Sequence, residues 1–221
     1  YRASTLLVRD VKARAHSHQL YDHQLVGDYG MYTIGYTILN LVNEIAVSNI
    51  REMEGTAAEK NAILGDMHFL RALVYFNLNQ YFTLPSTGYS VPLLKKPIGV
   101  NDRVSCNKAA EIREFVEEEI EKARNAFKNS SGVADYDAAT ALAARIYFYH
   151  EKYEKAYQMA DSVISSGNFT LDENVKAPFD PGTSSNAVIF ALKYNSADAV
   201  SPTEELFSDY QASESKGNLI L

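Results

Sequence analysis

Apolar residues recur every three or four positions through most of this chain, and that helical period is the feature that most limits its possible folds. It predicts a helix over residues 29–48 with two apolar stripes, so we expect that helix to be sandwiched between neighbours. It predicts a longer helix over 56–82, with Thr56 as the N-cap and Glu59 completing a capping box. Both segments favour an all-helical fold.

A loop and a charged helix follow. Pro85, Gly88, Pro92, Pro97 and Gly99 predict a loop of short extended pieces up to residue 101. The next helix is expected over 107–127, with Ser105 as its cap. Its glutamates alternate with lysines and arginines, so we interpret them as a solvent-exposed face rather than as a metal or acid site. These glutamates are Glu111, Glu114, Glu117, Glu118, Glu119 and Glu121.

A helical hairpin is predicted next, with one helix over 138–150 capped by Asp137 and another over 153–166 stopped by Gly167. Four of its residues have the relative spacing of the tetratricopeptide repeat, namely Ala144, Tyr147, Tyr153 and Ala156. One hairpin cannot bury both of its faces, so the earlier helices are expected to stack on it. The predicted fold class is therefore all-α, with tetratricopeptide-like hairpins, long loops and a few short extended segments.

The end of the chain changes character. Residues 169–171 and 187–194 are short apolar runs rich in strand-forming residues. Residues 201–205 read Ser-Pro-Thr-Glu-Glu, which predicts the start of one more short helix. The chain then ends on apolar residues, from which we expect it to be part of something longer.

Composition and charge exclude several classes of function. The formal net charge is −7 and no basic stripe occurs, so no nucleic-acid partner is expected. No apolar run approaches the length of a membrane-spanning helix. Cys106 is the only cysteine, which excludes a disulfide framework and a thiolate zinc cluster. No histidine lies near Cys106 in sequence, so it is not expected to be catalytic.

No cofactor, metal or catalytic residue is predicted. His16, His18 and His23, with nearby aspartates, form the only histidine cluster, but their spacing fits no zinc motif. His68 and His150 fall on packed helices and are expected to be hydrogen-bonded structural groups. The glycines are scattered singly, so no phosphate-binding loop and no nucleophile elbow is present.

Several blocks of sequence, taken in order, resemble the SusD/RagB family of outer-membrane nutrient-binding lipoproteins. One block is similar to the family pattern W-x3-Y-x2-I-x3-N, and it reads Tyr32-x3-Tyr36-x2-Leu39-x3-Asn43. Another is similar to G-[DE]-A-x-F-L-R-A-x2-Y, and it reads Gly65-Asp66-x2-Phe69-Leu70-Arg71-Ala72-x2-Tyr75. Further blocks are Tyr81-Phe82-x-Leu84-Pro85, Val91-Pro92-Leu93, Arg103-x-Ser105, the 138–171 stretch that includes the hairpin, and Asn186-x-Val188-Ile189-Phe190-Ala191-Leu192.

The resemblance implies a non-catalytic, surface-exposed outer-membrane lipoprotein that captures oligosaccharide or polysaccharide and delivers it to a SusC-like TonB-dependent transporter. It implies contact with the membrane only through a lipid anchor upstream of residue 1. It also implies that residues 1–221 form one SusD-like helical domain of a truncated or partial member, because family members usually run to about twice this length. Two alternatives remain open: a helical scaffold that clasps the transporter, or capture of peptides rather than glycans.

A ligand site for such a protein needs an aromatic face for the sugar ring and planar polar groups for its hydroxyls. The densest such mixture outside a helix lies just before residue 30 and predicts five site residues: Tyr21, Asp22, Gln24, Asp28 and Tyr29. The alternative is that Tyr21 and Tyr29 only anchor the end of a helix.

Overall fold

The computed structural model describes residues 12–13, 30–174, 177, 185–191 and 219–220. The chain divides into two compact units, one of residues 31–191 and one of residues 1–30 with 192–221. In the second unit, the described part is Gly30 and a pair of short antiparallel strands, β1 (Lys12–Ala13) and β2 (Leu219–Ile220). All the described helices belong to the first unit.

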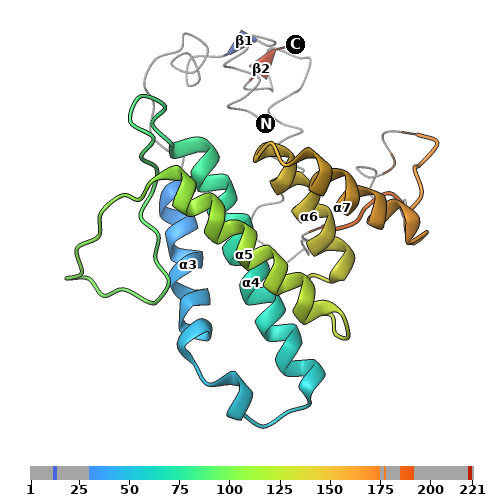
Figure 1. The fold of residues 1–221 in the computed structure, drawn as a ribbon, viewed down its shortest axis with the longest axis horizontal. Helices are drawn as coiled ribbons and strands as arrows, with labels where there is room; N and C mark the ends of the chain where they lie inside the picture. Colours follow the sequence, from blue (N-terminus) through green and yellow to red (C-terminus); the bar gives the residue numbers. More distant parts are fainter. Residues whose placement is uncertain (1–11, 14–29, 175–176, 178–184, 192–218, 221) are drawn as a thin grey trace. The chain divides into compact units, whose positions relative to one another are not determined.

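The helical unit is a sequential stack in which each α-helix packs against the next one along the chain. Figure 1 shows α3, α4 and α5 side by side, and the α6–α7 hairpin beyond them. The fold is all-α, as predicted. Its helices are α3 (Met31–Val47), η2 (Ile50–Glu52), α4 (Ala57–Phe82), α5 (Ala109–Phe127), α6 (Tyr136–Tyr149) and α7 (Tyr153–Ser165).

Helix ends test the predicted caps. The capping box of Thr56 and Glu59 is confirmed, because the Thr56 hydroxyl accepts from the Glu59 N–H and the Glu59 carboxylate accepts from the Thr56 N–H. Ser105 is not a cap: α5 begins only at Ala109, after Lys108, with no side-chain cap. Asp137 is also not a cap, since the carboxylate of Asp135 accepts from the Ala138 N–H at 2.7 Å.

Helix α3 buries one apolar stripe instead of two. Leu39 and Val42 are buried on the face toward α4, whereas Ile34 and Leu41 are 59% and 64% exposed. Within the described residues, α4 and the loop after it cover only one side of this helix. The expected sandwich is therefore not formed by these residues.

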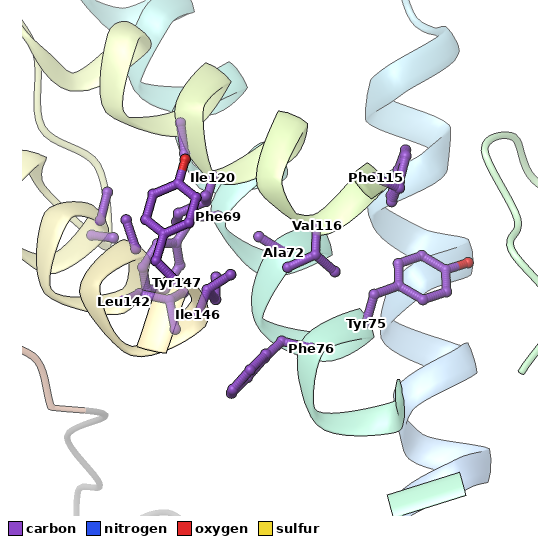
Figure 2. Packing of buried hydrophobic residues seen from close by; sticks show 14 of the residues in the cluster. Phe69, Ala72, Tyr75, Phe76, Phe115, Val116, Ile120, Leu142, Ile146 and Tyr147 are labelled. Carbon is purple, nitrogen blue, oxygen red and sulfur yellow. The ribbon is translucent and has the colours of Figure 1, made fainter. Parts of the chain in front are cut away.

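The core lies where α4, α5 and α6 meet. Figure 2 shows Phe69, Ala72 and Phe76 of α4 close to buried hydrophobic side chains of α5 and α6. The partners labelled there are Val116, Ile120, Leu142, Ile146 and Tyr147. Because these side chains are almost fully buried, their removal from water supplies the main stabilisation of the stack.

Two residues of the second motif block let α4 approach its neighbours. A Cβ built on Gly65 would lie 2.5 Å from the ring of Phe127, so only glycine allows the end of α5 to press against α4 here. The Asp66 carboxylate accepts hydrogen bonds from the N–H groups of Val133 and Ala134, at 2.9 and 3.0 Å. This side chain therefore fixes the connection between α5 and α6.

The acidic helix was predicted to expose its glutamates, and this is wrong for Glu119. Its side chain is 1% exposed, and its oxygens lie 2.7 Å from His68 Nδ1, 3.3 Å from Arg71 Nη1 and 3.0 Å from Lys122 Nζ. Burial by itself would raise the pKa of Glu119, but the hydrogen bond from His68 and the charge of Arg71 hold that pKa below its ordinary value. Glu119 thus carries a buried charge that joins α5 to α4.

A second glutamate of α5 holds the turn of the hairpin. Glu117 lies 2.9 Å from His150 Nδ1 and 2.6 Å from Lys152 Nζ, and residues 150–152 connect α6 to α7. His68 and His150 are therefore hydrogen-bonded groups, as predicted. The exposed-face interpretation of the glutamates is wrong at Glu117 as well, because this side chain is only 15% exposed.

The segment after α7 forms no strand within 169–171 or 187–191. Phe190 places its ring 5.3 Å from the ring of Phe69, so this segment packs onto α4. The short helix predicted from residue 201 lies outside the described residues.

A candidate ligand-binding groove

Part of the loop between α4 and α5, residues 92–98, lies against α3. The two arms of the loop are joined where Ser90 donates its N–H to the Asn107 carbonyl and Asn107 donates to Val91, at 2.9 and 3.2 Å. The Asn107 side chain also accepts from the Leu93 N–H at 2.9 Å. Residues 90–98 are thereby held in place as one wall of a groove.

Side chains of helix α3 form hydrogen bonds with the backbone of this wall. The Tyr36 hydroxyl donates to the Pro92 carbonyl at 2.6 Å, and Asn43 Nδ2 donates to the carbonyls of Leu94 and Lys96 at 3.0 and 3.3 Å. The side-chain oxygen of Asn40 accepts from the N–H of Ile98 at 3.0 Å.

These contacts have a regular spacing both in the loop and in the helix. The residues held are 92, 94, 96 and 98, every second position of a segment that bends at residues 95 and 96. The residues that hold them are Tyr36, Asn40 and Asn43, which share one face of α3 at helical spacing. Tyr36 and Asn43 of the first motif block, together with Asn40, therefore fasten the loop to helix α3.

Helix α4 also holds the wall of the groove, through Tyr75. The Tyr75 hydroxyl accepts from the Leu94 N–H at 2.6 Å and donates to the Leu94 carbonyl at 3.2 Å. In Figure 2 its side chain reaches away from α4 beside Phe115. Burial raises the pKa of Tyr75 to about 12 and raises that of Tyr36 further. Both hydroxyls consequently stay protonated and able to donate.

A groove of about 600 Å³ lies between α3 and this wall, a size typical of small-molecule sites. It is lined by Tyr32, Thr33, Tyr36, Thr37, Asn40, Leu41, Pro92, Leu94, Ile98, Gly99, Val100 and Val104. None of these residues is charged.

The lining of the groove combines an aromatic ring with hydroxyl groups. The half-buried ring of Tyr32 is held between Tyr36 and Phe82, with ring centroids 4.8 and 5.3 Å away. One turn along, the Thr37 hydroxyl donates to the Thr33 carbonyl at 2.9 Å and keeps its lone pairs available as acceptors. This arrangement can stack on a sugar ring and accept hydrogen bonds from its hydroxyls.

The predicted ligand residues Tyr21, Asp22, Gln24, Asp28 and Tyr29 lie outside the described residues, so this site stays a prediction. The cluster of His16, His18 and His23 also lies outside them. In the part of the chain that the structure describes, no group of three His, Cys, Asp or Glu side chains is placed to hold a metal ion.

The groove could not be predicted from the sequence. In the sequence, Tyr32 and Tyr36 only fall at helical spacing among apolar residues and belong to the first motif block. The nearest signal was the polar pair Asn40 and Asn43 on the same helix, because amides on a buried helix face need backbone partners. Cys106 is exposed.

None of the described helices combines the length and the unbroken apolar character that a bilayer-spanning helix requires. No protein-family model and no curated protein sequence matches the chain.

Solved structures do match. A SusD superfamily protein from Bacteroides thetaiotaomicron is 24% identical with a TM-score of 0.69, over 86% of this chain and 44% of that protein. A SusD-like protein from Bacteroides fragilis is 24% identical with a TM-score of 0.64, over 77% of this chain and 34% of that one. A laminarin-binding SusD-like protein is 17% identical with a TM-score of 0.56, over 66% and 33%.

The chain thus spans between about a third and somewhat under a half of the length of the structures it matches. Other matched structures are described as sugar-binding or carbohydrate-binding proteins. The described residues of this chain have the fold of SusD-superfamily proteins.

Proposed function

We propose that this chain is part of a non-catalytic cell-surface protein that captures oligosaccharide or polysaccharide. The observation that carries the proposal is the groove with no charged lining residue, lined in part by Tyr32, in a fold shared with a laminarin-binding protein. A tyrosine face offers stacking to the C–H surface of a sugar, and the neighbouring hydroxyls and amides offer hydrogen bonds.

The fastening of the groove wall supports binding energetically. Tyr36, Asn40, Asn43 and Tyr75 hold the backbone of residues 92–98 before any ligand arrives. A wall fixed in this way loses little conformational entropy on binding, so more of the contact energy appears as affinity.

The predicted residues Tyr21, Asp22, Gln24, Asp28 and Tyr29 form the second part of this proposal. They precede Tyr32 directly in the chain, and they carry the same combination of aromatic and planar polar groups. We propose that they contribute to sugar binding.

We further propose that the whole protein is an outer-membrane, surface-exposed lipoprotein with a lipid anchor upstream of residue 1. In this proposal it passes its ligand to a SusC-like TonB-dependent transporter. The likeness to SusD-superfamily structures supports this role.

Titration of the purified chain against a glycan panel and an oligopeptide panel tests the proposal. Binding to at least one glycan, weakened tenfold or more by Tyr32→Ala or by Tyr21→Ala with Asp22→Ala, supports it. A flat response to every glycan with binding to oligopeptides would instead assign the chain to peptide capture. A flat response to both panels would favour the scaffold alternative.

A further inference from the structure

The loop that walls the groove has a charge opposite to that of the whole chain. Residues 95–108 contain Lys95, Lys96, Arg103 and Lys108 against the single acid Asp102, which gives 4 − 1 = +3. The complete chain carries −7. Cations are therefore concentrated beside the proposed binding site.

Two of these cations are already engaged with groups of the fold. Lys108 Nζ donates to the Thr87 carbonyl at 3.0 Å and lies 3.6 Å from the centre of the Tyr89 ring. Lys95 Nζ lies 5.3 Å from the centre of the Phe115 ring. Both positive charges have partners that stabilise them where they are.

Lys96 and Arg103 differ from them. Both are exposed, and neither has a carboxylate within 4.0 Å among the described residues, where the ion pairs involve other cations. The only acid between them, Asp102, uses its carboxylate to accept from the Gly99 N–H at 2.8 Å. The loop thus presents two cations that the described fold does not use.

These two cations border a hollow of about 510 Å³. It is lined by Leu93, Leu94, Lys95, Lys96, Ile98, Asp102, Arg103 and Val104. Leu94, Ile98 and Val104 also line the groove, so the two depressions adjoin along the same loop. The Lys96 carbonyl is bound by Asn43, which fixes the backbone that carries this ammonium group.

We propose that the ligand is an anionic oligosaccharide, with a ring seated in the groove and a carboxylate or sulfate paired with Lys96 and Arg103. This inference rests on the proposed function and names its substrate class. A guanidinium presents a planar fork of donors that fits a carboxylate or sulfate, and an ammonium adds a second positive charge. Uronic acids and sulfated sugars provide such anions on rings that retain an apolar face.

The test compares matched ligands on the same protein. Oligogalacturonate and its methyl-esterified, uncharged form are titrated into the chain at low salt and at 0.3 M NaCl, with sulfated carrageenan oligosaccharides and neutral laminarin oligosaccharides beside them. We expect at least one anionic sugar to bind tenfold or more tightly than the neutral sugars, and this preference to shrink as salt rises. Carboxylate is distinguished from sulfate by which anionic sugar shows the preference.

Variants assign the preference to the two cations. Lys96→Gln with Arg103→Gln is expected to lower the affinity for the anionic sugar at least tenfold and to leave that for neutral sugars unchanged. Lys128→Gln, an exposed cation at the far end of α5, is the matched control and should change neither. Equal melting temperatures of the three proteins exclude loss of folding as the cause.

Three results would overturn the inference. Neutral sugars that bind as tightly as anionic ones would refute it and leave the proposed glycan capture intact. An anionic preference that survives the double substitution would place the anion elsewhere. If no glycan binds but polyglutamate binds through Lys96 and Arg103, both the sugar class and the proposed function are wrong.

Discussion

The Tyr75 hydroxyl binds both backbone polar groups of Leu94, accepting from its N–H at 2.6 Å and donating to its carbonyl at 3.2 Å. The same carbonyl accepts from Asn43 of α3. One residue of the loop is thus held by two helices at once. Because Leu94 also lines the groove, this contact links the packing of the helices to the shape of the proposed site.

Replacement of Tyr75 by phenylalanine removes only one oxygen atom, but it should clearly lower the stability of the fold. The substitution leaves the buried N–H of Leu94 without a partner, since no other acceptor contacts it in the described residues. We expect the free energy of unfolding to fall by about 1–3 kcal/mol, measured by urea denaturation. Tyr81→Phe is the matched control, because Tyr81 is 63% exposed and should change stability by less than about 0.5 kcal/mol.

Glu119→Gln tests the buried charge network between α4 and α5. It removes the anion that faces His68, Arg71 and Lys122 and leaves Arg71, itself 6% exposed, without its carboxylate. We expect the free energy of unfolding to fall by about 3–5 kcal/mol at neutral pH. A loss below about 1 kcal/mol would mean that the network contributes little to holding these helices together.

The stabilisation by Glu119 should also depend on pH. Its pKa is lower in the folded chain than in the unfolded one, so its stabilisation is complete above the ordinary carboxyl value of about 4.3. The stabilisation is lost as the pH falls through the lower, folded-state pKa. The difference in unfolding free energy between parent and Glu119→Gln should then shrink below about pH 4. A difference that stays constant from pH 7 to pH 3 would contradict this assignment.

Gly65→Ala tests the close approach of α4 and α5. Alanine favours a helix over glycine by about 1 kcal/mol, so an open site would be stabilised by the change. Here the new Cβ would meet the Phe127 ring at 2.5 Å, and we expect a net loss of about 1–3 kcal/mol in thermal or urea unfolding. Phe127→Leu in the Gly65→Ala background should recover part of that loss. If Gly65→Ala stabilises the protein, the two helices are farther apart than described.

The fold was largely predictable because apolar residues recur at helical spacing along most of its helices. The capping box at Thr56, the end of α4 at Phe82 and the hairpin turn at residues 150–152 follow from local sequence. The wrong caps have a local cause as well: Asp135 and Asp137 are both plausible caps by residue type, and only the backbone conformation selects Asp135.

The buried glutamates were missed for a different reason. A charged helix with alternating signs looks exposed in sequence, and nothing within α5 indicates that Glu119 faces His68 and Arg71 on a helix 51 and 48 residues earlier. Arg71, on an otherwise apolar face, was the better clue, because a buried guanidinium requires an acceptor. The groove was missed likewise, since it is formed by α3 and a loop that lies more than 50 residues away in sequence.

The most direct test of glycan capture by the groove is calorimetric titration of the best glycan into the parent chain, Tyr32→Ala and Tyr157→Ala. Tyr157 is 67% exposed on α7 and does not line the groove, so it controls for loss of an exposed ring. Thr37→Val is measured in parallel, because it removes a groove hydroxyl without removing a ring. We predict at least tenfold weaker binding for Tyr32→Ala, a smaller loss for Thr37→Val and unchanged affinity for Tyr157→Ala. Unchanged affinity in a folded Tyr32→Ala variant would contradict the assignment of sugar binding to this groove.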